Sequence, residues 1–407
     1  MIESKAAASG NAIHRRDFLK GGAAATAAGL MIAKEGVAQA GAPSLAGANS
    51  YAAKLTASGV LPSNLPQRPG PPISIDAHCH WAPEAYMKAK ADLGRADFIN
   101  PSNHDLALRV KWMDEHGEKM QVLTLGGFMP WQWVSEESGG HIAQVTNDAA
   151  LEAHNAYPDR FLYGIELPVG YPAVALKELN RVAGKPGAVA VHLPNSLAAR
   201  EYLFEPAFAP LLARIEELGI PILLHPLDGI PNFYAGGRLN DPYSGNNPNA
   251  AESLFPGLTN SIGETFEQAT TVSKLIVSGT MDKYPNLQII VAHAGGAFPY
   301  VVGRLDRGMG PGRLKQPVHA YIRRFYFDNL AWYPLALKYL IDLVGSDRVV
   351  VGTDNMGGQG GQGGGANAAA AAGGPVPGPN SVMDQLDLPA ADRDLILRGN
   401  LTRLFKL

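Results

Sequence analysis

The sequence contains a single cysteine, Cys79, among 407 residues, so no disulfide can form within the chain. Charge is sparse as well: charged residues make up 17% of the chain, and the formal net charge is −3, with both signs mixed throughout. This balance offers no basic patch for nucleic acid or anionic lipid, and we expect neither as a partner. We interpret Cys79 as a small buried side chain rather than a reactive thiol.

The apolar run near the N-terminus, Gly21 to Ala33, is too short and too weakly apolar to cross a membrane as a stable helix. Arg15 and Arg16 precede it, and Ala38-Gln39-Ala40 follows it as a small-x-small cleavage site. This order is typical of a twin-arginine signal, and a chance arginine pair on a disordered tail is the alternative. We therefore predict a signal peptide over residues 1–40 and a periplasmic or secreted protein without a membrane anchor.

We interpret the rest of the chain as a linker, residues 41–72, and one barrel domain, residues 73–407. The linker is rich in Ala, Pro and Ser. With 46% apolar residues, the chain can bury a substantial core. Short strand-like runs alternate with amphipathic helical runs, a pattern that favours βα units and parallel pairing. Eight strands are predicted: Ile73–Ala77, Gln121–Leu125, Phe161–Ile165, Ala188–His192, Pro221–His225, Leu287–His293, Phe325–Leu330 and Arg348–Asp354.

Eight parallel strands are the number that closes a TIM (β/α)8 barrel, so we predict an α/β fold of this type. An open doubly wound sheet is the competing fold, but it would need a glycine-rich turn after its first strand. His78-Cys79-His80 stands there instead, so we favour the barrel. The helices predicted between and after the strands include His104–His116, Glu137–Tyr157, Pro206–Leu218, Pro334–Val344 and Ala390–Leu404.

Metal-liganding side chains stand at the ends of the predicted strands. His78 and His80 follow the first strand, and period-two alternation places both imidazoles on one side of it. Asp354 ends the eighth strand, on the face where barrel enzymes carry out catalysis. One histidine at such a position is more often structural, but several beside a carboxylate favour a divalent metal, zinc first, with manganese or iron as alternatives. Three further histidines end predicted strands: His192, His225 and His293.

Four motifs occur in a characteristic order: IDAHCH, ILLHP, VAHAGGAFPYVVGRLD and VVVGTDN. In this order they resemble the branch of the amidohydrolase superfamily that is typified by aminocarboxymuconate-semialdehyde decarboxylase. γ-Resorcylate and 5-carboxyvanillate decarboxylases belong to the same branch. The similarity extends from about Ile73 to the C-terminus and implies a barrel of the metal-dependent hydrolase type.

The resemblance assigns roles to individual residues. His293 matches the family's catalytic histidine, which hydrogen-bonds a metal-bound water. Arg304 matches an arginine that holds a substrate carboxylate, often across a homodimer interface, although an ion pair on a helix surface is an equal alternative. Arg109 matches a second carboxylate-binding arginine, but its residue pattern alone favours a structural role. The resemblance implies four metal ligands: His78, His80, His225 and Asp354.

The fourth predicted strand contains no lysine that could bridge two metals, so we predict one divalent ion. Such an ion lowers the pKa of bound water from 15.7 to roughly 7, and a nearby histidine can exchange its proton. We expect a metal-dependent decarboxylase, a carboxy-lyase for an unsaturated or aromatic carboxylic acid. Hydrolysis of an ester, lactone or amide is the close alternative. A non-catalytic metal- or ligand-binding barrel is the third, although such a protein has no need of a non-ligating His293.

Two long segments interrupt the resemblance, and both follow strand ends on the catalytic face. Asp228 to about Asn260 is rich in Gly, Asn and Pro, and Gly357–Pro379 is almost entirely Gly, Ala, Gln and Pro. Relatives commonly continue after the last aspartate with Tyr-Pro or His-Pro, whereas this chain continues with Asn355-Met356. Because this region shapes the substrate pocket, the family's substrates cannot be transferred to this chain. We expect the second segment to be a mobile flap.

The export signal makes a direct prediction. Changing Arg15 and Arg16 together to Lys should keep the precursor in the cytoplasm, because the twin-arginine route reads the arginine pair itself. Fractionation of cells followed by immunoblotting measures this, and maturation near Ala40 should disappear with it. Lys5→Arg is the control, since it leaves the pair intact and should be exported normally. Normal export of the double variant would contradict the assignment.

Overall fold

The computed structural model describes seven stretches of the chain, all within the compact unit formed by residues 52–407. The predicted signal peptide and linker, residues 1–72, lie outside the described residues, as do most of the two long segments 228–260 and 357–379. The described residues are 73–95, 103–197, 200–227, 259–309, 312, 314–354 and 382–407.

Eight parallel strands form one sheet in the order of the sequence. An isolated parallel bridge between Asp76 and Val351 joins the two ends of that sheet, which confirms the predicted barrel. The strands are β1 (Ser74–His80), β2 (Glu118–Thr124), β3 (Phe161–Glu166), β4 (Ala188–Pro194), β5 (Ile222–His225), β6 (Ile289–Val291), β7 (Phe325–Asp328) and β8 (Val349–Val350).

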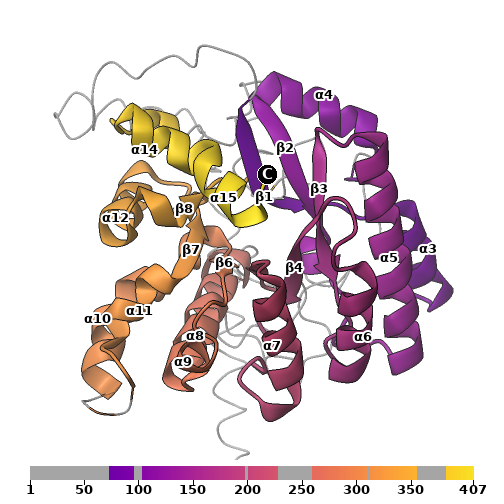
Figure 1. Cartoon of the computed structure of the whole chain (residues 1–407). Helices are drawn as coiled ribbons and strands as arrows, with labels where there is room; N and C mark the ends of the chain where they lie inside the picture. The colour runs from indigo at the N-terminus through magenta and orange to yellow at the C-terminus, as the bar shows by residue number, and fades with distance from the viewer. Residues whose placement is uncertain are drawn as a thin grey trace, which may run out of the picture. The chain divides into compact units, whose positions relative to one another are not determined.

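Helices surround the strands (Figure 1). The α-helices are α3 (Glu84–Asp92), α4 (Leu106–His116), α5 (Glu136–Ala156), α6 (Pro172–Val182), α7 (Ala209–Leu218), α8 (Glu264–Val277), α9 (Thr280–Lys283), α10 (Phe298–Met309), α11 (Val318–Tyr321), α12 (Pro334–Val344), α14 (Ala390–Asp394) and α15 (Asn400–Phe405). Single-turn 3-10 and π segments are η2 (Gly126–Phe128), η3 (Pro206–Phe208), η6 (Thr259–Gly263), η7 (His293–Gly295), η8 (Ile322–Arg324), η9 (Ser346–Arg348), η10 (Met383–Gln385) and η11 (Leu395–Gly399).

Helix ends follow local side-chain chemistry. The Asp105 side chain accepts a hydrogen bond from the backbone N–H of Leu108 and so caps α4. Ser135 and Ser138 form a reciprocal capping box at the start of α5. Gly117, in the left-handed conformation, ends α4. These signals explain why the predicted and observed boundaries of α4 and α5 differ by no more than two residues.

The predicted helix Ala390–Leu404 is interrupted. It consists of α14, a π-helical segment and α15. The side chain of Asn400, at the junction between the last two pieces, is buried and donates hydrogen bonds to the carbonyls of Ser346 and Val349. This contact fixes the C-terminal helix to the beginning of β8, and π segments often occur where such a side chain must be aimed.

The packing of β1 departs from regular alternation just before the two histidines. Ile75 and Ala77 contact the inner core, whereas Cys79 packs in the outer layer between strands and helices. Strict alternation would put Cys79 inside with Ile75 and Ala77. The register between β1 and β2 shifts between Asp76 and Cys79, and this irregularity reverses the alternation. The Cys79 thiol donates to the carbonyl of Val122 and is fully buried, as expected of a small filler.

Candidate metal centre

His78 and His80 lie side by side at the carboxyl end of β1. Their rings are stacked, with centroids 5.5 Å apart and planes inclined by 23°. The two imidazoles therefore lie on one side of the strand, as predicted from the His-x-His spacing. The Nδ1–H of His78 donates to Oδ2 of Asp328 at 2.7 Å. Its Nε2 is buried and lies 3.6 Å from Oδ1 of Asp354, beyond hydrogen-bond distance. When Nδ1 holds the only proton, Nε2 presents a lone pair, which is what a metal ligand needs.

His225 and Asp354 approach these histidines from distant parts of the chain. His225 ends β5, and its Nδ1–H donates to the carbonyl of Pro226 at 2.6 Å, so its Nε2 also carries a lone pair. The Nε2 of His80 lies 3.1 Å from Nε2 of His225 and 3.0 Å from Oδ1 of Asp354. Oδ1 of Asp354 also lies 3.6 Å from Nε2 of His78, so the four residues predicted as metal ligands lie close together, and their function as ligands stays a prediction.

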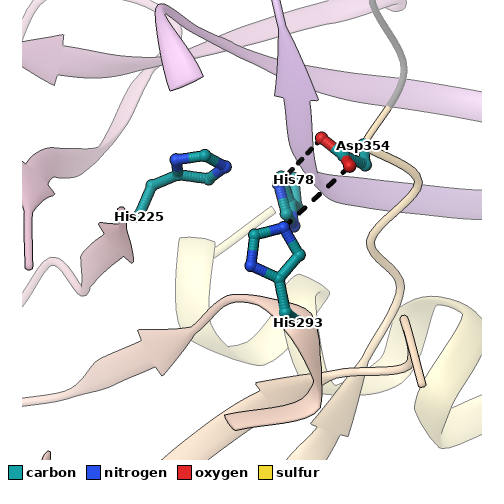
Figure 2. Close-up of side chains that lie close together, drawn as sticks. All are labelled: His78, His225, His293 and Asp354. Carbon is teal, nitrogen blue, oxygen red and sulfur yellow. Dashed lines mark ion pairs between the residues drawn. The ribbon is translucent and has the colours of Figure 1, made fainter. Parts of the chain in front are cut away.

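Figure 2 shows His293 beside His78, His225 and Asp354, with the side chains directed at a common space. These four residues each offer one ligand atom, and the atoms lie within 4.8 Å of one another. Imidazole nitrogens with one carboxylate form a donor set that suits zinc or another borderline divalent ion. The Nε2 of His78, buried and beyond hydrogen-bond distance of Asp354, also fits an ion. The residues present are therefore compatible with one metal.

His293 and Asp354 do not end strands, which corrects the prediction. β6 stops at Val291 and β8 at Val350. His293 has φ 52° and Asp354 has φ 55°, the left-handed region that non-glycine residues rarely adopt. Both side chains are thereby directed at the centre by tight turns just beyond the strands. Strained backbone of this kind persists where surrounding contacts hold it, frequently at functional sites.

Burial and mutual charge set the protonation of the cluster. Burial lowers the pKa of His78, but the carboxylates of Asp328 and Asp354 outweigh burial and raise the pKa to about 10. Burial, with the neighbouring imidazoles, holds the pKa of His225 well below its usual range. Burial likewise lowers the pKa of His293 to about 4. Burial raises the pKa of Asp354, but the imidazoles of His78 and His80 reverse this and hold it well below its usual range.

The raised pKa of His78 has a consequence for metal binding. Without an ion, the two carboxylates favour a proton on each ring nitrogen of His78. An ion at Nε2 must displace one of these protons, so metal affinity should rise with pH. The carboxylates that stabilise the second proton would equally stabilise a positive ion in its place.

Asp328, at the end of β7, was not singled out from the sequence. Its carboxylate accepts from the His78 imidazole and also from the backbone N–H groups of His293, Ala294 and Leu330, at 2.7–3.0 Å. Burial raises the pKa of this group, but the hydrogen bond from His78 and the backbone donors lower it below its usual value. In the sequence, an aspartate within an apolar predicted strand was the one sign of this role.

Asp76 on β1 and His192 on β4 make their hydrogen bonds outside the cluster. Asp76 accepts from the backbone N–H of His78 at 2.9 Å and from the Thr353 hydroxyl at 2.6 Å, which ties β1 to the end of β8. Burial raises the pKa of Asp76 to about 7. His192 donates from Nδ1 to Glu166 at 2.7 Å. Both residues therefore support the walls around the cluster.

The two predicted arginines lie in contrasting environments. The guanidinium of Arg109 is fully buried and donates to Oε1 of Gln121 at 3.0 Å and to the carbonyl of His80 at 2.6 Å. These contacts suit a structural role beside the metal centre. Arg304 is exposed on α10 and is not among the residues that line the cavity of its own chain. Substrate binding by either arginine stays a prediction.

A cavity of about 330 Å³ opens beside His293 and Asp354. Trp332, Tyr339 and Leu330 contribute to a mainly apolar wall, and Ser261 and Thr265 add hydroxyl groups. Trp332 is held at φ 53° in the segment between β7 and α12, and 53% of its surface is exposed. The cavity has the size and lining of a small-molecule site.

Comparison with known proteins identifies the family. The amidohydrolase profile matches residues 75–407, which is most of the chain. The chain belongs to the amidohydrolase family. A twin-arginine signal profile matches residues 12–31 of this amidohydrolase, so the predicted export signal is confirmed. Within the described residues, none of the helices has the length and apolarity needed to span a bilayer.

Several decarboxylases are similar to this amidohydrolase. A 2-amino-3-carboxymuconate-6-semialdehyde decarboxylase of Dictyostelium discoideum is 25% identical over 72% of this chain and 79% of its own length. A γ-resorcylate decarboxylase of a Rhizobium strain is 28% identical over 68% of this chain and 85% of its own length. These relatives confirm the predicted branch of the family. They also confirm the prediction that the protein is an enzyme.

A solved structure shares the fold. The 5-carboxyvanillate decarboxylase of Novosphingobium aromaticivorans, complexed with manganese and 4-hydroxy-3-methoxy-5-nitrobenzoic acid, superposes with a TM-score of 0.63. The match covers 82% of this chain and 96% of that one, at 21% identity. A likeness at this level of identity establishes the barrel fold alone.

The Asp328 contacts predict the behaviour of one variant. Asp328→Asn should weaken metal binding by about 10–100-fold, because the partner that orients His78 and strengthens its lone pair loses its charge. Competition against a chelator dye measures the affinity. Asp342→Asn is the matched control, since Asp342 is exposed on α12 and pairs only with Lys338 among the contacts described. Unchanged affinity in Asp328→Asn would show that Asp328 serves the backbone turns alone.

Proposed function

We propose that this chain is a metal-dependent carboxy-lyase that decarboxylates an unsaturated or aromatic carboxylic acid. The observation that carries the proposal is the apolar, aromatic cavity that opens directly at His293 and Asp354. A flat aromatic acid can lie against Trp332 and Tyr339 with its carboxylate toward the histidine cluster. The relatives named as decarboxylases of carboxymuconate semialdehyde and γ-resorcylate support this substrate class.

His78, His80, His225 and Asp354 would hold one divalent ion. The ion would supply positive charge beside the oxygen atoms of the substrate. Zinc suits a set of imidazoles and one carboxylate, while the manganese in the 5-carboxyvanillate decarboxylase structure makes manganese the first alternative. Asp328 and the Pro226 carbonyl orient the His78 and His225 rings toward that position.

His293 is the proposed acid–base residue. It lines the cavity, and its Nε2 lies 3.9 Å from Oδ2 of Asp354. In the reaction, the bond between the substrate carbon and its carboxylate breaks, carbon dioxide leaves, and the electron pair stays on the carbon. His293 passes a proton to this carbon, which forms the new carbon–hydrogen bond, as solvent delivers a proton to the same ring, so that the imidazole is neutral before and after the step. Positioned acid–base groups of this kind contribute about 10²–10⁴-fold to rates.

We further propose that Arg304 binds substrate in the site of a second copy, in a homodimer. The Arg304 side chain is exposed on α10. Pro299 and Tyr300, near the beginning of the same helix, line the cavity. An exposed cation outside its own cavity can serve a carboxylate only across an interface. The export signal suggests that this assembly works in the periplasm, with the precursor cleaved near Ala40.

The function is tested with purified, metal-loaded protein. We expect close to one metal ion per chain and release of carbon dioxide from at least one member of a panel of hydroxybenzoic and unsaturated acids. His293→Ala should keep its metal and lose turnover by about 10²–10⁴-fold. His319→Ala, on the surface of α11, is the control and should match the parent protein.

Three outcomes would contradict the function. Acid release from esters, lactones or amides without decarboxylation would make the protein a hydrolase. Tight binding of aromatic acids with no turnover would make it a binding protein. Loss of metal in His293→Ala would make His293 a ligand, in keeping with its place among the four clustered side chains.

The dimer is tested by complementation. His293→Ala and Arg304→Ala should each be inactive alone, since one lacks its proton donor and the other its carboxylate partner. Mixed dimers of the two contain one complete site if Arg304 acts across the interface. Random pairing should then restore about one quarter of the parent activity. No recovery would place Arg304 in its own site, and an active Arg304→Ala would remove it from substrate binding.

A further inference from the structure

A buried glutamine contacts His293 from the outside of the site. Gln268 lies on α8, and its side chain is fully buried. Its Nε2 is 2.9 Å from the carbonyl oxygen of Ala292 and 2.9 Å from Nδ1 of His293. One amide group therefore spans the backbone and the imidazole just after β6.

The Ala292 contact determines which way the amide points. A backbone carbonyl can only accept a hydrogen bond, so the amide atom next to it must be the nitrogen. That nitrogen carries two hydrogens and accepts nothing. One hydrogen goes to Ala292 and the other faces Nδ1 of His293, which must then be the acceptor.

The acceptor role of Nδ1 fixes the proton of the neutral imidazole. A neutral histidine with an unprotonated Nδ1 carries its hydrogen on Nε2. In His293, Nε2 is the nitrogen that faces Asp354, across 3.9 Å. His78 and His225 show the opposite arrangement, because each donates from Nδ1, to Asp328 and to the Pro226 carbonyl respectively.

We propose that Gln268 is a positioning residue that holds His293 in the Nε2–H form, so that His293 presents a proton to the site while Nε2 of His78 and of His225 would be left to bind an ion. The use of this proton rests on the proposed function, whereas the tautomer itself does not. By fixing this tautomer, Gln268 makes His293 a hydrogen donor and so distinguishes it from the imidazoles that are proposed to bind the metal. It explains how five side chains can meet at one centre without all of them binding the ion.

Nitrogen-15 NMR of histidine-labelled protein tests the tautomer. Long-range proton–nitrogen correlations distinguish Nδ1–H from Nε2–H, and the His293 signals are assigned from their loss in His293→Ala. We expect an unprotonated Nδ1 for His293 and a protonated Nδ1 for His225 in the same spectrum. The full-length protein is measured with zinc bound and after chelation. A protonated Nδ1 on His293 in both states would overturn the proposal.

Two variants test the part played by Gln268. Gln268→Glu replaces the donor facing His293 by a carboxylate oxygen, which should draw the hydrogen to Nδ1 and reverse the tautomer. Gln268→Leu removes the partner and should leave a mixture of both forms. Gln288→Glu is the control, because the Gln288 amide donates only to the nearby Asn286 carbonyl among the contacts described. An Nε2–H signal that is unchanged in both Gln268 variants would overturn the proposal.

Kinetics connect the tautomer to the reaction. Gln268→Glu should lower kcat by about 10²-fold or more while KM stays within a few-fold of the parent value, since the lost group acts in proton transfer. A merely structural defect would change both constants and lower the thermal midpoint. An Nε2–H tautomer in a protein without decarboxylase activity would support Gln268 and contradict the proposed function. Full activity with a reversed tautomer would contradict the link between them.

Discussion

The buried carboxylate of Asp328 is the constraint on which the rest of the centre depends. It accepts a hydrogen bond from the His78 imidazole, and it accepts two more from the backbone N–H groups of His293 and Ala294. A buried negative charge is stable in this position because several hydrogen-bond donors surround it. Removing one of these partners would leave the charge uncompensated and would destabilise the fold. The same carboxylate therefore orients a metal ligand and stabilises the left-handed turn that aims His293. Ligand geometry and catalytic geometry cannot vary independently around it.

Much of this arrangement could be predicted from the sequence because it obeys local periodicities. Eight apolar runs predicted eight strands, and the His-x-His spacing correctly placed His78 and His80 on one side of β1. Asp328 escaped prediction because its partner His78 is 250 residues away, and no spacing rule connects them. Gln268 escaped for a related reason: a buried glutamine on a helix has no sequence pattern until the strand beside it is known.

The geometry beyond the strand ends was the least predictable part. His293 and Asp354 were expected to continue their strands, but both adopt positive φ in turns. Side-chain patterns report which face of an element is buried, not where a non-glycine residue will enter the left-handed region. That conformation is imposed by contacts such as those from Asp328 to the His293 turn. It becomes visible only when the barrel has brought β6 and β7 together.

The imidazoles of His78, His225 and His293 lie close together, but the group that contacts Nδ1 is different in each. Asp328 and the Pro226 carbonyl accept from His78 and His225, so each of those rings turns Nε2 inward as a ligand atom. A donor faces Nδ1 of His293, so that ring turns a hydrogen inward. His192, which donates to Glu166, shows that the same device also operates in the wall of the barrel. The protonation of each imidazole is thus determined by a neighbouring group that need not contact the metal or the substrate. The positions of the histidines in the sequence therefore predict where such a site lies. The partners of their outer nitrogens determine which ring binds metal and which ring donates a proton.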